Sequence, residues 1–306
     1  MVSCTILSTL PLACRRRGCL TRLVSLDELC TLIERHARRP HTAIDGLMLA
    51  VIDEPSAPEP AMAGPILALV AQGAKRLAMG ERTYDYGAGQ FLVVSVDLPV
   101  IGHYTEAPFL GLGLVLRPAA VAALLLETSA DGRAEAGTQP GMAVSDAPAE
   151  LLDAAVRLLR LLDHPADLPV LAPLIQKEIL WRLLTGDQGA MIRQIGLADS
   201  SLSHIGRAIR RIRDRHADAL RIDDLAQLSG MSVSSFHRHF RTVTAMTPIQ
   251  FQKHIRLQQA RLLLISTGDD VADVGHRVGY DSASQFSREY RRQFGVPPGH
   301  EPARRR

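Results

Sequence analysis

The chain has 306 residues, of which 46% are hydrophobic and 22% charged, and its formal net charge is +3. This length predicts two domains, and the apolar fraction excludes an intrinsically disordered chain because it is large enough to build a core. No apolar run approaches the roughly 20 residues that span a bilayer, and the first residues lack the basic segment that opens a signal peptide. We therefore expect a cytoplasmic protein with no membrane partner.

Charge is distributed unevenly along the chain. Residues 201–306 contain 18 Lys and Arg against 10 Asp and Glu, which leaves 17 against 22 for the rest. A basic C-terminal third on an acidic body indicates a polyanionic partner held by one domain. Because phosphate contacts release counterions, we expect this binding to weaken steeply as the salt concentration rises.

Residues 1–20 are predicted to be a flexible extension. All cysteines lie within the first 30 residues, at Cys4, Cys14, Cys19 and Cys30. Their spacing contains no C-x2-C pair, so it does not predict a structural zinc site. Free thiols are the simpler interpretation. The alternative is a thiol- or electrophile-responsive role, because the arginines at 15–17 would lower the pKa of a neighbouring thiol.

Residues 21–120 are predicted to form a small β-barrel. A helix is expected first, because Leu26, Leu29 and Ile33 repeat at helical spacing. Short apolar runs then alternate with Gly and Pro, which is typical of a barrel or jelly roll. The expected strands are 47–52, 66–70, 75–79, 82–86, 90–96 and 109–116. The sequence lacks histidines paired two residues apart on a strand, the usual metal-binding pattern of such barrels. We therefore predict no metal, no cofactor and no enzyme.

Residues 121–185 are predicted to be a helical dimerisation segment. Helices are expected over 118–130, 148–162 and 173–184, and the last two carry apolar stripes wider than a barrel surface requires. Homodimerisation through one of these helices is favoured over packing within one chain. Residues 186–200 are interpreted as the linker to the next domain.

The C-terminal part contains one unit twice, over 222–242 and 270–293. Phe236 and Phe286, like Arg238 and Arg288, are related by an offset of 50 residues. Each copy is predicted as a helix, a tight turn and a second helix, with glycine in the turn. Ser232 is expected to cap the second helix of the first copy, and either Asp281 or Ser282 that of the second.

A polar face is expected on the second helix of each copy, opposite its aromatic residues. Short polar groups and arginines on one helix face suit the base edges and phosphates of a major groove. A long helix over 248–264 is expected to connect the copies. It would hold the two second helices about one DNA turn apart, roughly 34 Å.

This tandem pattern resembles the DNA-binding domain of the AraC/XylS transcriptional regulators, over the last third of the chain. One departure is Ala245, where that family usually has the glycine that is still present as Gly295. The segments that carry the resemblance are Leu225-Ala-Gln-Leu-Ser-Gly-Met-Ser, Phe236-His-Arg-His-Phe, 247–248, 256–263, 278–280, 284–288 and Phe294-Gly-Val-Pro-Pro.

The resemblance implies which side chains contact DNA. Arginine would pair with guanine O6 and N7, and glutamine with adenine N6 and N7. The alternative is that Arg238 or Arg288 packs against Asp or Glu neighbours. The implied base-reading residues are Ser234, His237, Arg238, Ser284, Gln285 and Arg288. The implied phosphate contacts are Ser232, Arg241, Ser282 and Arg292.

The segments 71–76, 84–87, 91–99 and 151–162 resemble the cupin-like N-terminal domain of a subgroup of the same regulators. That resemblance implies an effector-sensing barrel. Strand alternation places either Tyr84 and Tyr86 inside, or Asp85, and a purely structural core is the alternative for each candidate. The pocket candidates are Gln72, Lys75, Tyr84, Tyr86, Ser95, His103 and Tyr104.

The sequence therefore predicts an α+β protein, with a cupin-like β-barrel and flanking helices before an all-α tandem helix-turn-helix domain over 201–306. The expected function is a transcriptional regulator that binds double-stranded operator or promoter DNA and a small-molecule effector. It would act as a homodimer, with RNA polymerase as a further partner if it activates. The alternatives are the thiol-responsive regulator and a cupin-type enzyme fused to a DNA-binding domain.

Overall fold

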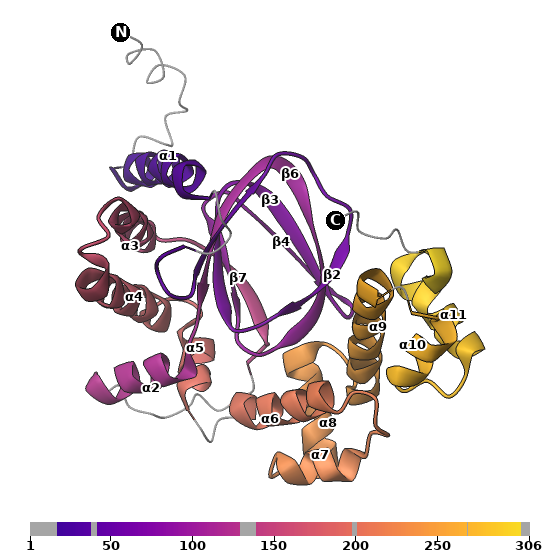
Figure 1. Ribbon diagram of the computed structural model, residues 1–306. Coiled ribbons are helices and arrows are strands. Elements are labelled where there is room, and N and C mark those ends of the chain that lie inside the picture. Colours follow the sequence, from indigo (N-terminus) through magenta and orange to yellow (C-terminus); the bar gives the residue numbers. More distant parts are fainter. Residues whose placement is uncertain (1–16, 38–41, 129–138, 198–200, 268, 301–306) are drawn as a thin grey trace.

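A seven-stranded antiparallel sheet curls into a barrel in the N-terminal part of the molecule (Figure 1). The computed structural model describes residues 17–37, 42–128, 139–197, 201–267 and 269–300. The strand order is β1-β6-β3-β5-β7, with β2 paired to β6 and β4 paired to β3. The strands are β1 (Leu47–Ile52), β2 (Glu59–Ala63), β3 (Ile66–Met79), β4 (Arg82–Gly87), β5 (Gln90–Val94), β6 (Leu98–Val115) and β7 (Met142–Asp146).

The long strand β3 merges two segments that the sequence predicts as separate strands. It runs through Gly73, where φ is +76° and a Cβ would lie 2.6 Å from the carbonyl oxygen of Glu106. The pairing of β3 with β6 shifts register between Val70 and Lys75, so β3 continues through Gly73 as an irregular, bulged strand. Glycine within a strand pattern marks a bulge here and not a strand end.

Two strands fall outside the predicted set. β2 contains Pro60, which is tolerated because in the described sheet this strand pairs only with β6 and its other edge is open. β7 lies beyond the predicted barrel limit at residue 120. It pairs antiparallel with β5, with Gln90 opposite Asp146 at one end and Val94 opposite Met142 at the other. The barrel therefore extends past 21–120, because a distant segment returns to its edge, and local periodicity does not record such a pairing.

Helices cover one side of the barrel (Figure 1). α1 (Arg17–His36) packs on α3 (Ala149–Arg160), which continues into a short 3-10 turn, Leu161–Asp163. α4 (Leu168–Thr185) lies against α3, and α2 (Pro118–Glu127) lies against α5 (Gly189–Gly196). α1 begins at residue 17, inside the predicted extension, of which residues 1–16 lie outside the described part of the chain.

α5 occupies most of the segment predicted as a linker over 186–200. Its buried residues Met191, Ile192 and Ile195 repeat at helical spacing. The glycines at both of its ends, Gly189 and Gly196, are the signals that indicate a linker in the sequence. The segment is a packed helix because its apolar face lies against α2 and α4.

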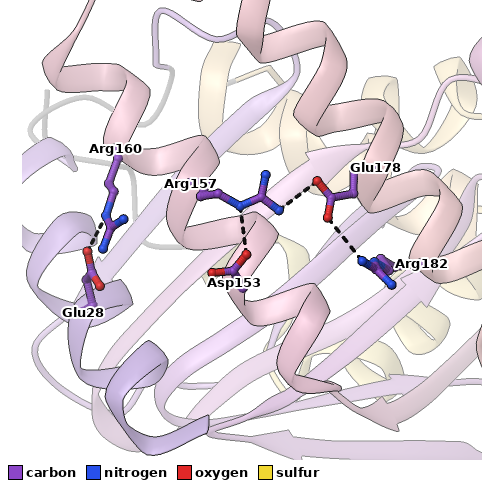
Figure 2. Close-up of polar contacts among 6 residues, drawn as sticks. All are labelled: Glu28, Asp153, Arg157, Arg160, Glu178 and Arg182. Carbon is purple, nitrogen blue, oxygen red and sulfur yellow. Dashed lines mark hydrogen bonds and ion pairs between the residues drawn. The ribbon is translucent and has the colours of Figure 1, made fainter. Parts of the chain in front are cut away.

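Ion pairs join α1, α3 and α4 on their outer side (Figure 2). Arg157 of α3 lies 2.8 Å from both Asp153 Oδ2 and Glu178 Oε2, the second of which belongs to α4. Arg160 of α3 pairs with Glu28 of α1 at 2.6 Å. Exposed pairs contribute only about 0–1 kcal/mol each. These contacts therefore orient the three helices more than they stabilise them.

The C-terminal helices form two helix-turn-helix units joined by α9, as predicted. Residues of the first unit, such as Phe236 and Phe240, belong to the same continuous core as the barrel. Leu257, Phe286 and Tyr290 belong to a separate core in the second unit. The first unit is thus packed on the barrel. The elements are α6 (Ser201–Asp214), α7 (Ile222–Leu228), α8 (Val233–Thr244), α9 (Pro248–Thr267), α10 (Val271–Arg277), α11 (Ala283–Phe294) and a 3-10 turn, Pro298–His300.

Candidate nucleic-acid interface and ligand cavity

The first helix-turn-helix unit consists of α7, a turn at Gly230 and α8. Ser232 caps α8, because its hydroxyl oxygen accepts a hydrogen bond from the backbone N–H of Ser235 at 3.3 Å. Phe236 and Phe240 are fully buried, with 5.5 Å between their ring centroids. Burial of this aromatic face directs the opposite face of α8 into solvent.

The second unit repeats this construction with α10 and α11. Ser282, and not Asp281, caps α11 by accepting a hydrogen bond from the backbone N–H of Gln285 at 3.3 Å. Phe286 and Tyr290 are fully buried, again with 5.5 Å between ring centroids. The polar face of α11 is therefore presented in the same way as that of α8.

Every side chain implied as a DNA contact is exposed. Among the described residues, neither Arg238 nor Arg288 forms an ion pair with a carboxylate, so the packed alternative does not describe them. Gln285 is engaged, since its amide nitrogen donates to Glu289 Oε1 at 3.3 Å. The exposed set is Ser232, Ser234, His237, Arg238 and Arg241 at α8, with Ser282, Ser284, Gln285, Arg288 and Arg292 at α11.

Glu289 is a carboxylate at this interface that sequence reasoning missed. It accepts a hydrogen bond from the hydroxyl of Tyr280 at 2.9 Å and pairs with the ammonium of Lys253 at 3.0 Å. Burial would raise the pKa of Glu289, but hydrogen bonds from Lys253, Tyr280 and Gln285 outweigh that effect and lower it. A charged Glu289 therefore orients Gln285 on the exposed face of α11. Lys253 comes from another helix, so no local pattern indicates the cluster.

Arg82 of β4 also belongs to the surface of the first unit, although the sequence offers no signal for it. Its strand is predicted only as part of the barrel. The residues that line one solvent-open depression are Arg82, His237, Arg238, Arg241, Thr242 and Thr247. The depression thus combines a barrel side chain with implied DNA contacts of α8, and none of the described residues that line it is acidic.

A cavity of about 510 Å³ is bounded by strands β1 to β6. Most of its walls are apolar, including Met48, Leu92 and Val100. Among the described residues that line it, Lys75 is the only basic one and Glu59 the only acidic one. The Lys75 ammonium lies 4.7 Å from the centroid of the Tyr104 ring. Burial lowers the pKa of Lys75.

The pocket candidates divide between this lining and other places. Tyr86 joins Lys75 and Tyr104 in the lining, and burial raises its pKa. Asp85 points outward and pairs with Arg76, so the face of β4 that carries the tyrosines is the one that points into the barrel. Ser95 is buried and donates to the carbonyl oxygen of Gly141 at 3.2 Å. The candidates outside the lining are Gln72, Tyr84, Ser95 and His103.

An exposed apolar stripe runs along α4. Val170 is 65% exposed, Leu174 58% and Trp181 38%. These residues recur at helical spacing, so they lie on one side of the helix. The opposite side of α4, with Ile179 and Leu183, is buried in the molecule. A stripe of this kind suits a protein contact.

Two further observations concern the thiol groups and metal binding. Cys30 is a free, half-buried thiol, and burial, followed by the charges of Asp27 and Glu34, raises its pKa, which makes it less reactive. Cys4 and Cys14 lie outside the described residues. Within the part of the chain that is described, there is no metal-binding group of three or more His, Cys, Asp or Glu, and no helix long and apolar enough to cross a membrane.

Two protein-family models match the chain. Residues 43–191 match the N-terminus of AraC-type transcriptional regulators, and residues 225–303 match a helix-turn-helix domain. The chain belongs to the AraC family. The AraC-type resemblance found in both parts of the sequence is thereby confirmed.

Curated relatives are similar to about a third of the chain. The transcriptional regulator MtrA of Neisseria gonorrhoeae is 35% identical over 104 residues, which are 34% of each chain. The transcriptional activator RhaS of Escherichia coli (strain SE11) is 29% identical over 100 residues, which are 33% of this chain and 36% of RhaS. The alignments therefore span about a third of the length of these relatives.

Solved structures of ToxT from Vibrio cholerae share the fold over most of the chain. An apo form of ToxT that carries one lysine-to-alanine substitution has a TM-score of 0.52 at 9% identity, covering 84% of this chain and 97% of that one. Wild-type ToxT bound to an unsaturated fatty acid gives 0.52 at 9%, with coverage of 85% and 95%. The fold is thus shared at very low sequence identity.

Proposed function

We propose that the chain regulates transcription by binding specific DNA sequences through α8 and α11, under the control of a small molecule held in the barrel cavity. The observation that carries DNA binding is the repeated pairing of a buried aromatic face with an exposed polar face. Family membership supports the same role. Arg238 and Arg288 are assigned to guanine and Gln285 to adenine, with Ser234, His237 and Ser284 at neighbouring base edges.

The remaining contacts are assigned to phosphates. Arg241 and Arg292 follow the base-reading residues along α8 and α11, and Ser232 and Ser282 begin the helices. The serine hydroxyls already accept a backbone hydrogen bond as caps, which leaves each of them a proton to donate to a phosphate oxygen. These contacts position the helices without specifying sequence.

A mobility-shift titration of the full chain on its own upstream DNA, at two salt concentrations, tests this assignment. Arg238→Ala and Arg288→Ala are expected to lose selectivity, each costing on the order of 1–3 kcal/mol of discrimination. Arg160→Ala, which removes the same charge from α3, is expected to bind as the wild type does. Binding that is salt-sensitive but unselective, and equal in all variants, would contradict the base-reading assignment.

The cavity favours a ligand with an apolar body and one anionic group. Its walls are mainly apolar. Among the described residues, the one acidic lining residue, Glu59, forms no ion pair or hydrogen bond with Lys75, and burial lowers the pKa of that lysine. An unsaturated fatty acid, the ligand of one ToxT structure, is a molecule of this kind. We assign the effector to the amphipathic carboxylic acids, with its carboxylate toward Lys75 and its chain along the apolar walls.

Calorimetric titration of the full chain with palmitoleate tests the effector class. Lys75→Gln is expected to weaken binding at least about tenfold, because a charge-assisted contact is lost. The methyl ester of palmitoleate should bind as weakly to the wild type as the acid binds to the variant. Lys177→Gln, a surface lysine on α4, is the matched control. Equal binding of acid and ester would exclude the role given to Lys75.

The proposal includes a homodimer formed through the exposed stripe of α4. Val170, Leu174 and Trp181 are apolar, lie on one side of the helix and are exposed, Trp181 least, in the described part of the chain. A two-fold axis through this stripe would cover the same patch on both subunits. Such a dimer would bring two DNA-binding domains to the same DNA. We place this regulator in the cytoplasm, with RNA polymerase as a further partner if it activates transcription.

A further inference from the structure

We propose that the barrel itself contacts DNA, through Arg82 of the β3–β4 hairpin binding a backbone phosphate beside α8. This inference rests on the proposed function, because it requires α8 to lie on DNA. Its basis is the depression in which Arg82 is brought together with Arg238 and Arg241. Two of these arginines come from the DNA-binding domain and one from the effector domain.

The tip of the hairpin is in direct contact with the first helix-turn-helix unit. Gly80 has φ +59°, and a Cβ there would lie 2.8 Å from the carbonyl oxygen of Ala245 and 2.9 Å from Met246 Cγ. Only glycine allows the hairpin to approach the α8–α9 turn this closely. Arg82 begins β4 immediately after this turn, so its backbone position is set by that contact.

Further ties hold the barrel against the same unit. The backbone N–H of Gly141, just before β7, donates to the carbonyl oxygen of Val243 on α8 at 3.0 Å. Arg213 of α6 pairs with Asp97, between β5 and β6. The buried residues on both sides also form one continuous core. Arg82 is therefore held beside α8 and does not reach it from a separately moving domain.

The electrostatics of the depression favour an anion. Arg82, Arg238 and Arg241 are exposed, and none of the described residues that line the space between them is acidic. Like charges that share a surface without a counter-charge repel, and an anion placed between them removes that repulsion. With α8 in a major groove, the chemical group that flanks the helix is the phosphodiester backbone. Arg82 and Arg241 are thus placed to bind it.

A salt series of DNA binding by the full chain, followed by fluorescence anisotropy, tests the contact. For Arg82→Ala, the slope of log K against log salt is expected to fall in magnitude by about 0.9, the value for one phosphate contact. Affinity should fall by about three- to tenfold on the operator and on a scrambled duplex alike, because phosphates carry no sequence. Arg238→Ala should instead weaken the operator far more than the scrambled duplex.

Arg76→Ala is the matched control. Arg76 lies on the same hairpin and carries the same charge, but it is paired with Asp85 on the outer face at 2.5 Å. Its removal should leave the salt slope unchanged, and Arg82→Lys should retain the wild-type slope. Thermal unfolding of each variant checks that the fold is kept.

The outcomes separate this inference from the proposed function. If Arg82→Ala keeps the wild-type slope and affinity while Arg241→Ala lowers both, the barrel does not contact DNA and the proposed function stands. If the wild-type chain itself shows no selective binding, the proposed function fails and the hairpin contact fails with it. A loss shared by Arg82→Ala and Arg76→Ala would reflect net charge and would also overturn the contact.

Discussion

Arg256 of α9 donates a hydrogen bond from Nη1 to the carbonyl oxygen of Gly279, 2.7 Å away in the turn of the second unit. Its Nε donates to the carbonyl oxygen of His216 at 2.6 Å, in the segment between α6 and α7. Nη2 reaches the carbonyl oxygens of Ala217 and Asp218 at 3.1 and 3.0 Å. One guanidinium thus joins the turn of the second unit to the segment that leads into α7 of the first, and we expect it to help set how α8 and α11 lie relative to each other.

We predict that Arg256→Lys makes the distance and orientation between α8 and α11 less fixed. Lysine keeps the charge but lacks the planar fork that serves several carbonyl oxygens at once. The free energy of unfolding should fall by about 1.5–3 kcal/mol, the range for hydrogen bonds to a charged group. The wild type should lose affinity sharply when one or two base pairs are inserted between the half-sites, and the variant should lose less. An unchanged spacing preference in the variant would show that the two units are held by other contacts.

We predict that Gln258→Leu uncouples the effector from DNA binding. The buried amide of Gln258 on α9 donates to the carbonyl oxygens of Ala61 at 3.3 Å and Val100 at 3.5 Å. Ala61 belongs to β2, which lines the cavity, so a ligand that shifts β2 acts directly on α9. Palmitoleate should bind the variant normally but no longer change its DNA affinity. Gln259→Leu, on a different side of α9, is the control and should retain the coupling, which is typically about 1–3 kcal/mol.

Palmitoleate binding is predicted to weaken at alkaline pH. Burial lowers the pKa of Lys75 below its ordinary value of 10.5, so the ammonium loses its proton at a lower pH than an exposed lysine does. Without ligand, the folded state binds this proton less tightly than the unfolded state, so this group costs stability as pH falls below 10.5. A bound carboxylate favours the charged form and reverses the shift. Titrations at about pH 7 and pH 10 should show the loss for the acid in the wild type, but not for the methyl ester or in Lys75→Gln.

How far the sequence predicts the structure depends on whether the signal is local. The helix-turn-helix units are predicted closely, because Phe236 and Phe240 repeat within one helix and Ser232 caps the same helix. Their counterparts in the second unit then follow at a fixed offset. The exposed DNA-contacting face follows from those buried residues without any knowledge of tertiary contacts.

The barrel and its cavity are predicted less well because they depend on pairing between distant segments. Alternation alone leaves Tyr86 and Asp85 equally eligible for the interior, and only the register of β4 on β3 selects Tyr86. β7 returns to the sheet after α2 and gives no periodic signal of its own. Arg82 lies beside α8 through contacts of the hairpin tip, and a strand residue carries no sequence mark of such a neighbour.

Leu174→Glu is predicted to convert the proposed homodimer into a monomer. Leu174 lies at the centre of the exposed stripe of α4, where a carboxylate would be buried without a partner in a two-fold interface. Sedimentation equilibrium of the two proteins measures the change. Leu126→Glu on α2, where the leucine is 84% exposed, is the control and should leave the assembly unchanged. A monomer produced by Leu126→Glu and not by Leu174→Glu would place the interface on α2.

Ala245 and Gly295 occupy equivalent positions after α8 and α11, and both adopt left-handed backbone conformations. Ala245 has φ 55° and Gly295 has φ 78°. An L side chain in this region costs roughly 1–2 kcal/mol, which the extra flexibility of glycine in the unfolded chain partly offsets. Ala245→Gly is therefore predicted to stabilise the first unit by about 0.5–1 kcal/mol.

Gly295→Ala is the reciprocal change and should destabilise the second unit by a similar amount. A Cβ at Gly295 would meet nothing within 4 Å, so its effect would come from the backbone alone. Denaturant unfolding of the two variants and the wild type measures both differences. Because the two substitutions are the reverse of each other at equivalent caps, we expect stability changes of opposite sign. If both variants were destabilised, the contact of Ala245 with the hairpin tip at Gly80 would stabilise the first unit by more than the left-handed conformation of Ala245 costs.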